Sequence, residues 1–123
     1  MAKILVADDE LEIIQFCTFV LNKNGHTVIH TENGPQAIDM MKDEHPDLMI
    51  MDVMIPGMDG YTIQLQVSQN DDLLKIPVIV MSALKPAKTL FDKFPQVVAF
   101  LSKPFEAEDL LGAVKQALEE AKK

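Results

Sequence analysis

The sequence has a single cysteine, a minority of basic residues and no long apolar run. Cys17 has no partner for an internal disulfide, and it shares an apolar pattern with Ile14 and Leu21, where a buried free thiol is common. No apolar run approaches the ~20 residues of a membrane span. The first residues also lack the apolar stretch and small-residue cleavage site of a signal peptide. These absences predict a soluble, cytoplasmic protein with no membrane partner.

Positive charge is scarce as well. The chain has 11 lysines and arginines against 19 aspartates and glutamates, a formal net charge of −8. Because nucleic-acid affinity depends mainly on neutralising phosphates, this balance disfavours DNA and RNA as direct partners. A chain of 123 residues has the usual length of one domain and can bury about two-thirds of its unfolded surface. We therefore expect residues 1–123 to form one globular domain that needs no disulfides.

Short apolar runs alternate with longer stretches of helical character. The runs comprise residues 4–7, 26–30, 48–51, 77–81 and 97–101. This alternation predicts repeated βα units, that is, an α/β fold around a parallel sheet. Helical periodicity is clearest in residues 107–121 and is also present in residues 10–24. A further helix is expected to begin near Pro35 and to end before Pro46.

In two stretches the local sequence pattern alone does not determine the secondary structure. Residues 61–68 alternate strictly between apolar and polar side chains, which locally favours a strand. Parallel neighbours need a crossover, usually a helix, between the runs at 48–51 and 77–81, so we predict a helix there. Pro86 and Pro95 are expected to bracket another helix of about two turns.

Polar residues of particular kinds follow the predicted strands. Asp8 and Asp9 follow the first strand, Asp52 the third, Ser82 the fourth and Lys103 the fifth. In an open α/β sheet the carboxyl ends of the strands border the ligand crevice, so these side chains are expected to converge there. Two carboxylates ~4 Å apart repel by about 4 kcal/mol at an effective dielectric constant of 20, so such a cluster must recruit a cation or take up a proton.

Hard oxygen ligands favour Mg²⁺, which commonly binds one or two carboxylates together with a phosphate oxygen. Metal-assisted phosphoryl transfer follows, with Asp52 as the nucleophile. Lys103 and the Ser82 hydroxyl would bind the incoming phosphoryl oxygens. Taken singly, each residue has a structural explanation: residues 8–10 as a helix cap, Asp52 as a loop acid, Ser82 as a strand-end residue and Lys103 as a surface lysine. Their joint placement favours the functional interpretation.

Four short segments carry a resemblance to a known family. They are residues 4–10 (ILVADDE), 52–60 (DVMIPGMDG), 82–83 (SA) and 103–105 (KPF). In this order and placement they resemble two-component response-regulator receiver domains, in particular the stand-alone, chemotaxis-regulator-like members. The resemblance spans essentially the whole chain. It implies a flavodoxin-like, doubly wound fold, in which five helices flank a five-stranded parallel sheet of order 2-1-3-4-5.

The resemblance also implies roles for individual residues. Asp52 would accept a phosphoryl group from a sensor histidine kinase or phosphotransfer protein. Mg²⁺ would be bound directly by Asp9, mainly through water by Asp8, and by Asp52 and the Met54 carbonyl.

On the same resemblance, Ser82 would bind a phosphoryl oxygen, Lys103 would pair with it, and the Lys103–Pro104 peptide would be cis. Phe100 occupies the aromatic switch position, which would turn inward as Ser82 moves. The implied output is binding of a downstream protein target and is compatible with a dimer that forms on phosphorylation. We expect a phosphoacceptor switch that supports its own Mg²⁺-dependent phosphorylation and dephosphorylation but converts no metabolite.

Two other classes remain as alternatives. One is a pure interaction module with a vestigial pocket, against which the intact set of polar residues argues. The other is an aspartyl-phosphate hydrolase of the haloacid-dehalogenase type, which ordinarily has a second aspartate where this chain has Met54.

Overall fold

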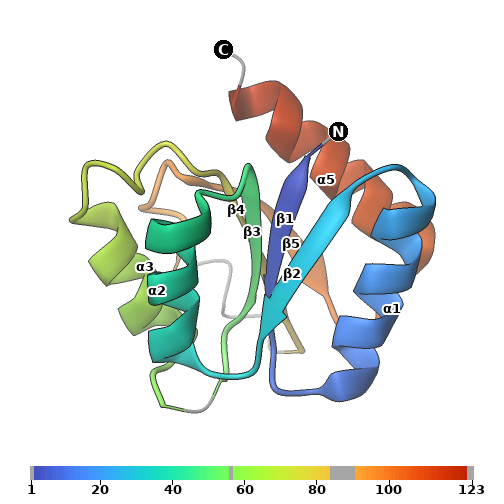
Figure 1. Cartoon of the computed structure of the whole chain (residues 1–123), viewed down its shortest axis with the longest axis horizontal. Helices are drawn as coiled ribbons and strands as arrows, with labels where there is room; N and C mark the ends of the chain where they lie inside the picture. The colour runs from blue at the N-terminus through green and yellow to red at the C-terminus, as the bar shows by residue number, and fades with distance from the viewer. Residues whose placement is uncertain (1, 56, 84–90, 122–123) are drawn as a thin grey trace.

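A five-stranded parallel sheet forms the centre of the computed structural model, which describes residues 2–55, 57–83 and 91–121. The strands are β1 (Lys3–Ala7), β2 (Thr27–Thr31), β3 (Leu48–Asp52), β4 (Val78–Ser82) and β5 (Val97–Ser102). Their order is β2-β1-β3-β4-β5, and every neighbouring pair is parallel (Figure 1). The predicted sheet is therefore confirmed, with each apolar run forming one strand.

Helices cover both faces of the sheet. The described residues form α1 (Leu11–Lys23), α2 (Gly34–Glu44), α3 (Gly60–Ser68) and α5 (Ala107–Ala121). The fourth of the five predicted helices, between Pro86 and Pro95, falls largely on residues 84–90, which lie outside the described residues. None of the described helices has the length and apolar character needed to cross a bilayer.

The sheet separates two apolar cores. Alternate residues of each strand point to opposite faces, so Ile4 and Val6 pack beneath α1 and α5, whereas Leu5 and Ala7 pack beneath α2 and α3. The central strand β3 is buried along its whole length, as expected for a parallel sheet covered on both sides. This double covering holds the carboxyl ends of the strands in fixed positions.

The helix α3 forms despite its alternating sequence. Asp59 caps its first turn, because its carboxylate accepts hydrogen bonds from the Thr62 N–H at 2.8 Å and the Thr62 hydroxyl at 3.0 Å. The buried side of the helix carries Ile63, Gln64 and Val67, so one position that looks solvent-facing in a strand pattern is an interior glutamine. The crossover requirement therefore outweighs the local strand preference, and the prediction of a helix is confirmed.

Candidate functional site

Polar side chains from three strand ends meet at the carboxyl edge of the sheet. The Lys103 ammonium donates to Asp8 Oδ2 at 2.9 Å and to Glu10 Oε1 at 2.9 Å, and it also bonds Asp52 Oδ2. The backbone positions the lysine, since the Lys103 N–H donates to the Ser82 carbonyl at 2.9 Å and its peptide bond to Pro104 is cis, as expected. Because only 11% of its side chain is exposed, Lys103 is not a surface lysine.

Asp8 is the innermost carboxylate of the site. Its side chain is fully buried, and its second oxygen accepts the Glu10 N–H at 2.8 Å. Burial raises the pKa of Asp8 to about 6, against the opposing effects of the Glu10 N–H and Lys103. Residues 8–10 do more than precede α1, because Asp8 and Glu10 both bind Lys103 and the Glu10 side chain, at the N-cap position, makes no capping hydrogen bond.

Asp52 ends the buried strand β3 and presents its carboxylate to the same space. One oxygen, Oδ1, accepts the Met54 N–H at 2.7 Å, and the other bonds Lys103. With 9% of its side chain exposed, Asp52 is held in one orientation by groups on both of its oxygens. The carboxylate is therefore fixed in position rather than a mobile loop acid.

The acidic residues form a set that suits a divalent cation. One carboxylate oxygen from each of Asp8, Asp9, Glu10 and Asp52 lies within 4.8 Å of the others. A lone ammonium cannot balance four neighbouring carboxylates, and hard oxygen donors prefer Mg²⁺ or a similar cation. The buried Asp8 and the exposed Asp9 occupy different depths in this set.

A cavity of about 330 Å³ joins most of the predicted site residues. Its lining consists of Asp9, Glu10, Asp52, Met54, Ser82, Ala83 and Lys103. Ser82 is half-buried here at the end of β4, whereas Met54 is 66% exposed. With Asp8, which bonds Lys103, the structure brings together every residue that we predicted for phosphoryl transfer and metal binding.

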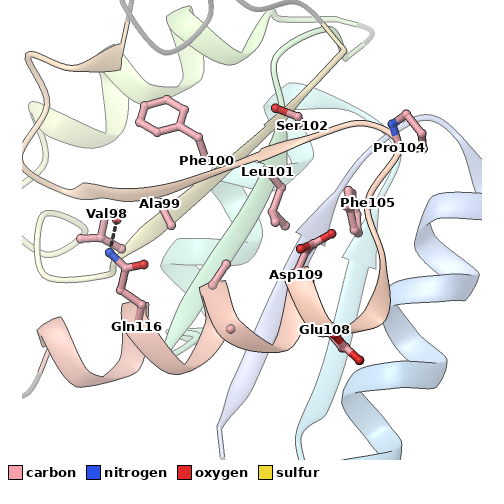
Figure 2. A pocket seen from close by; sticks show the side chains of 12 residues that line it. Val98, Ala99, Phe100, Leu101, Ser102, Pro104, Phe105, Glu108, Asp109 and Gln116 are labelled. Carbon is pink, nitrogen blue, oxygen red and sulfur yellow. Dashed lines mark hydrogen bonds between the residues drawn. The ribbon is translucent and has the colours of Figure 1, made fainter.

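Phe100 lies apart from this cavity, on β5. Its half-buried ring packs against the core beneath α2 and α3, whereas its neighbours Ala99 and Leu101 face α5. Figure 2 shows the ring pointing away from α5, on the opposite side of the strand from Leu101.

A second and larger hollow, of about 810 Å³, lies between β5 and α5 (Figure 2). Glu108 and Asp109 are the charged groups among the described residues that line it, with no lysine beside them. This hollow therefore offers no counterpart of the lysine-paired carboxylate at the strand ends.

Sequence reasoning missed two features. Glu10 follows the aspartate pair directly, yet its contact with Lys103 depends on a residue 93 positions away. The second feature is a buried amide pair far from the carboxylates, in which Gln64 Nε2 donates to Gln96 Oε1 at 2.9 Å. Residue spacing along the chain does not reveal contacts of this kind.

Comparison with known proteins gives a consistent result. The sequence profile of the response regulator receiver domain matches residues 4–115. Protein PilH of Pseudomonas aeruginosa is 32% identical over 120 residues, covering 96% of this chain and 98% of that protein. Sporulation initiation phosphotransferase F of Bacillus subtilis is 35% identical over 117 residues, covering 94% of this chain and 93% of that protein.

Solved structures share the fold. A putative response regulator from Chloroflexus aurantiacus superimposes with a TM-score of 0.90 at 28% identity, covering 96% of this chain and 98% of that one. The chemotaxis response regulator CheY4 of Vibrio cholerae gives a TM-score of 0.88 at 27% identity, covering 96% and 99% of the two chains.

Proposed function

The chain belongs to the response regulator receiver domain family, and on that premise we propose that Asp52 is its phosphoryl acceptor. Receiver domains are phosphorylation-dependent signalling switches that accept a phosphoryl group from a histidine kinase or phosphotransfer protein, and this chain is such a switch. The observation that carries the assignment is the Asp52 carboxylate, fixed at the end of β3 between Lys103 and the Met54 N–H. We assign the whole chain to this one domain.

The transfer is a displacement at phosphorus. An oxygen of the ionised Asp52 carboxylate forms the new P–O bond while the bond from phosphorus to the donor's leaving group breaks. Lys103 and the Ser82 hydroxyl line the same cavity and would donate hydrogen bonds to the phosphoryl oxygens. No general base is needed, because a carboxylate is itself a nucleophile.

Mg²⁺ fits the donor set, and we propose Asp8, Asp9, Asp52 and the Met54 carbonyl as the protein groups that hold it. When bound, the ion neutralises the charge that gathers on the phosphoryl oxygens during transfer. The same arrangement would support slow loss of the phosphoryl group to water, so that self-phosphorylation and autodephosphorylation both belong to the switch.

We propose that Ser82 and Phe100 transmit phosphorylation to the surface that a target protein binds. Ser82 lies on β4 and Phe100 on the neighbouring strand β5. The register pairs Val80 with Phe100 and Ser82 with Ser102. Movement of Ser82 toward a phosphoryl group would thus alter the strand next to Phe100, whose ring is half-buried against the core. A downstream protein would bind the altered surface. The cytoplasm is the compartment that we propose, because it would keep the free thiol of Cys17 reduced.

Intact mass spectrometry with acetyl phosphate tests the acceptor assignment. With Mg²⁺ the parent protein is expected to gain one phosphoryl group, and Asp52→Asn is expected to gain none. Asp59→Asn is the matched control, since Asp59 caps α3 outside the cavity. Full uptake by Asp52→Asn, or equal uptake after chelation of the metal, would overturn the proposal.

A further inference from the structure

Glu10 lines the cavity with a side chain that is 60% exposed, and it is not among the groups proposed above to hold Mg²⁺. We propose that Glu10 is a positioning residue that holds Lys103 in the unphosphorylated protein and thereby restrains phosphoryl transfer. The proposal rests on the function proposed above for Asp52. It starts from the contact of Glu10 Oε1 with Lys103 Nζ at 2.9 Å.

All three donors of the lysine are occupied. An ammonium has three N–H groups, and Lys103 directs them to Asp8, Glu10 and Asp52. A phosphoryl group arriving at Asp52 needs N–H donors for its own oxygens, so it must displace one of these carboxylates. Phosphoryl transfer therefore competes with the existing contacts of Lys103.

Glu10 is the partner that can yield. The Asp8 side chain is fully buried and bound to the Glu10 N–H, and Asp52 is held by the Met54 N–H. By contrast, the Glu10 side chain is 60% exposed, and Lys103 is its polar partner among the described contacts. If Glu10 releases Lys103, water can hydrogen-bond to its exposed carboxylate at little cost. If Asp8 releases Lys103, its carboxylate becomes a buried unpaired charge.

The direction of the effect follows from charge. Glu10 occupies one donor of Lys103, and it also adds negative charge where an anionic phosphodonor must enter. Removing its contact should therefore speed phosphorylation by a small donor. A partly exposed ion pair is worth up to about 1 kcal/mol, so the expected gain in rate is about two- to fivefold.

Three variants separate the contact from the charge. Glu10→Gln removes the charge and weakens the contact, whereas Glu10→Asp keeps the charge on a side chain one CH₂ group shorter and so lengthens the 2.9 Å contact with Lys103. Glu12→Gln is the control. Glu12 is exposed in the first turn of α1, two residues after Glu10, and this substitution removes the same charge.

The kinetic measurement is the initial rate of phosphorylation by acetyl phosphate with Mg²⁺. Glu10→Gln is expected to be fastest, Glu10→Asp also faster than the parent, and Glu12→Gln close to the parent. If Glu10→Gln is no faster than Glu12→Gln, or Glu10→Asp equals the parent, the contact does not restrain transfer and the proposal is wrong.

A second readout does not depend on phosphorylation. In the metal-free protein, an ammonium held by three carboxylates should exchange its protons slowly enough to give a sharp Lys103 Nζ signal by NMR. The signal is expected to persist in Glu12→Gln and to broaden in both Glu10 variants. An unchanged signal in the Glu10 variants would overturn the proposal. If the parent accepts no phosphoryl group, the proposed function fails, and the NMR signal alone decides whether Glu10 holds Lys103.

Discussion

Lys103 Nζ lies 2.9 Å from Asp8 Oδ2, although the two residues are 95 positions apart in the sequence. The contact spans the sheet from the end of β5 to the end of β1, and both side chains are almost entirely shielded from water. The lysine is thus a neutralising charge that the protein itself supplies to two buried carboxylates, Asp8 and Asp52.

Replacing this lysine should destabilise the metal-free protein. Lys103→Met leaves Asp8 and Asp52 close together without an ammonium, and loss of one partner from a buried pair costs about 3 kcal/mol or more. Mg²⁺ should restore part of the loss by binding the folded state. The measurement is urea unfolding with and without Mg²⁺.

Lys3→Met is the control for that experiment. Lys3 pairs with Glu44 at 3.2 Å on the exposed surface, and such a pair contributes at most about 1 kcal/mol. Equal losses in the two variants, or a loss in Lys103→Met that Mg²⁺ leaves unchanged, would contradict the charge-balancing role of Lys103.

Gly60 should tolerate no side chain, because it packs against the segment that follows Asp52. A Cβ atom there would lie 2.8 Å from the Val53 Cα and 2.9 Å from the Asp52 carbonyl oxygen. We expect Gly60→Ala to cost about 1–3 kcal/mol and to slow phosphorylation, since the backbone beside Asp52, the proposed acceptor, must shift. Gly112→Ala is the control, because a Cβ at that position in α5 meets nothing within 4 Å. It should be neutral or gain up to about 1 kcal/mol. Thermal unfolding that shows the same loss in both variants would refute this expectation.

The two glutamines of the buried amide pair should contribute unequally to stability. Gln96 Nε2 donates to the Leu73 and Ile76 carbonyls at 2.7 Å each, whereas Gln64 Oε1 has no partner in the described part of the chain. Gln96→Leu is therefore expected to cost about 2–3 kcal/mol, and Gln64→Leu about 1 kcal/mol or less. Chemical denaturation of the two variants measures the difference. A larger loss in Gln64→Leu would show that the bonds to the two carbonyls do not carry the stabilisation.

The cap of α3 should make stability depend on pH. The Thr62 N–H, aided by the Thr62 hydroxyl, lowers the pKa of Asp59 in the folded protein. The folded state therefore binds this proton less readily than the unfolded state, and the stabilisation is present above the unfolded pKa of about 4 and is lost as the pH falls through the lower folded value. Asp59→Asn keeps an uncharged cap. Its free energy of unfolding is expected to be lower than that of the parent at about pH 6, and this difference should shrink as the pH falls to about 2. A difference that stays constant over this range would exclude the charged cap as its cause.

The sequence predicts the sheet well because buried parallel strands are short, apolar and separated by helical stretches. Asp8, Asp52, Ser82 and Lys103 could be assigned to one site because each lies at or just beyond a strand end, and the topology brings strand ends to one edge. The order of the strands came from the family resemblance, since periodicity alone does not determine which strands are neighbours.

Other features could not be predicted from spacing. Gln64 looks solvent-facing in an alternating segment, and its burial depends on how α3 meets the start of β5. The Glu10 contact likewise needs the long lysine side chain to cross the site from β5. Both are tertiary contacts between side chains that carry no local signal. The helix predicted between Pro86 and Pro95 stays a prediction, because most of it lies outside the described residues.

Mapping the phosphorylated residue tests the central claim most directly. After incubation with acetyl phosphate and Mg²⁺, borohydride reduction converts a phosphoaspartate to homoserine, which peptide mass spectrometry can locate. The account predicts homoserine at position 52 alone, with Asp8, Asp9 and Glu10 unmodified although they lie within 4.8 Å. Homoserine at another aspartate, with Asp52 intact, would contradict the account.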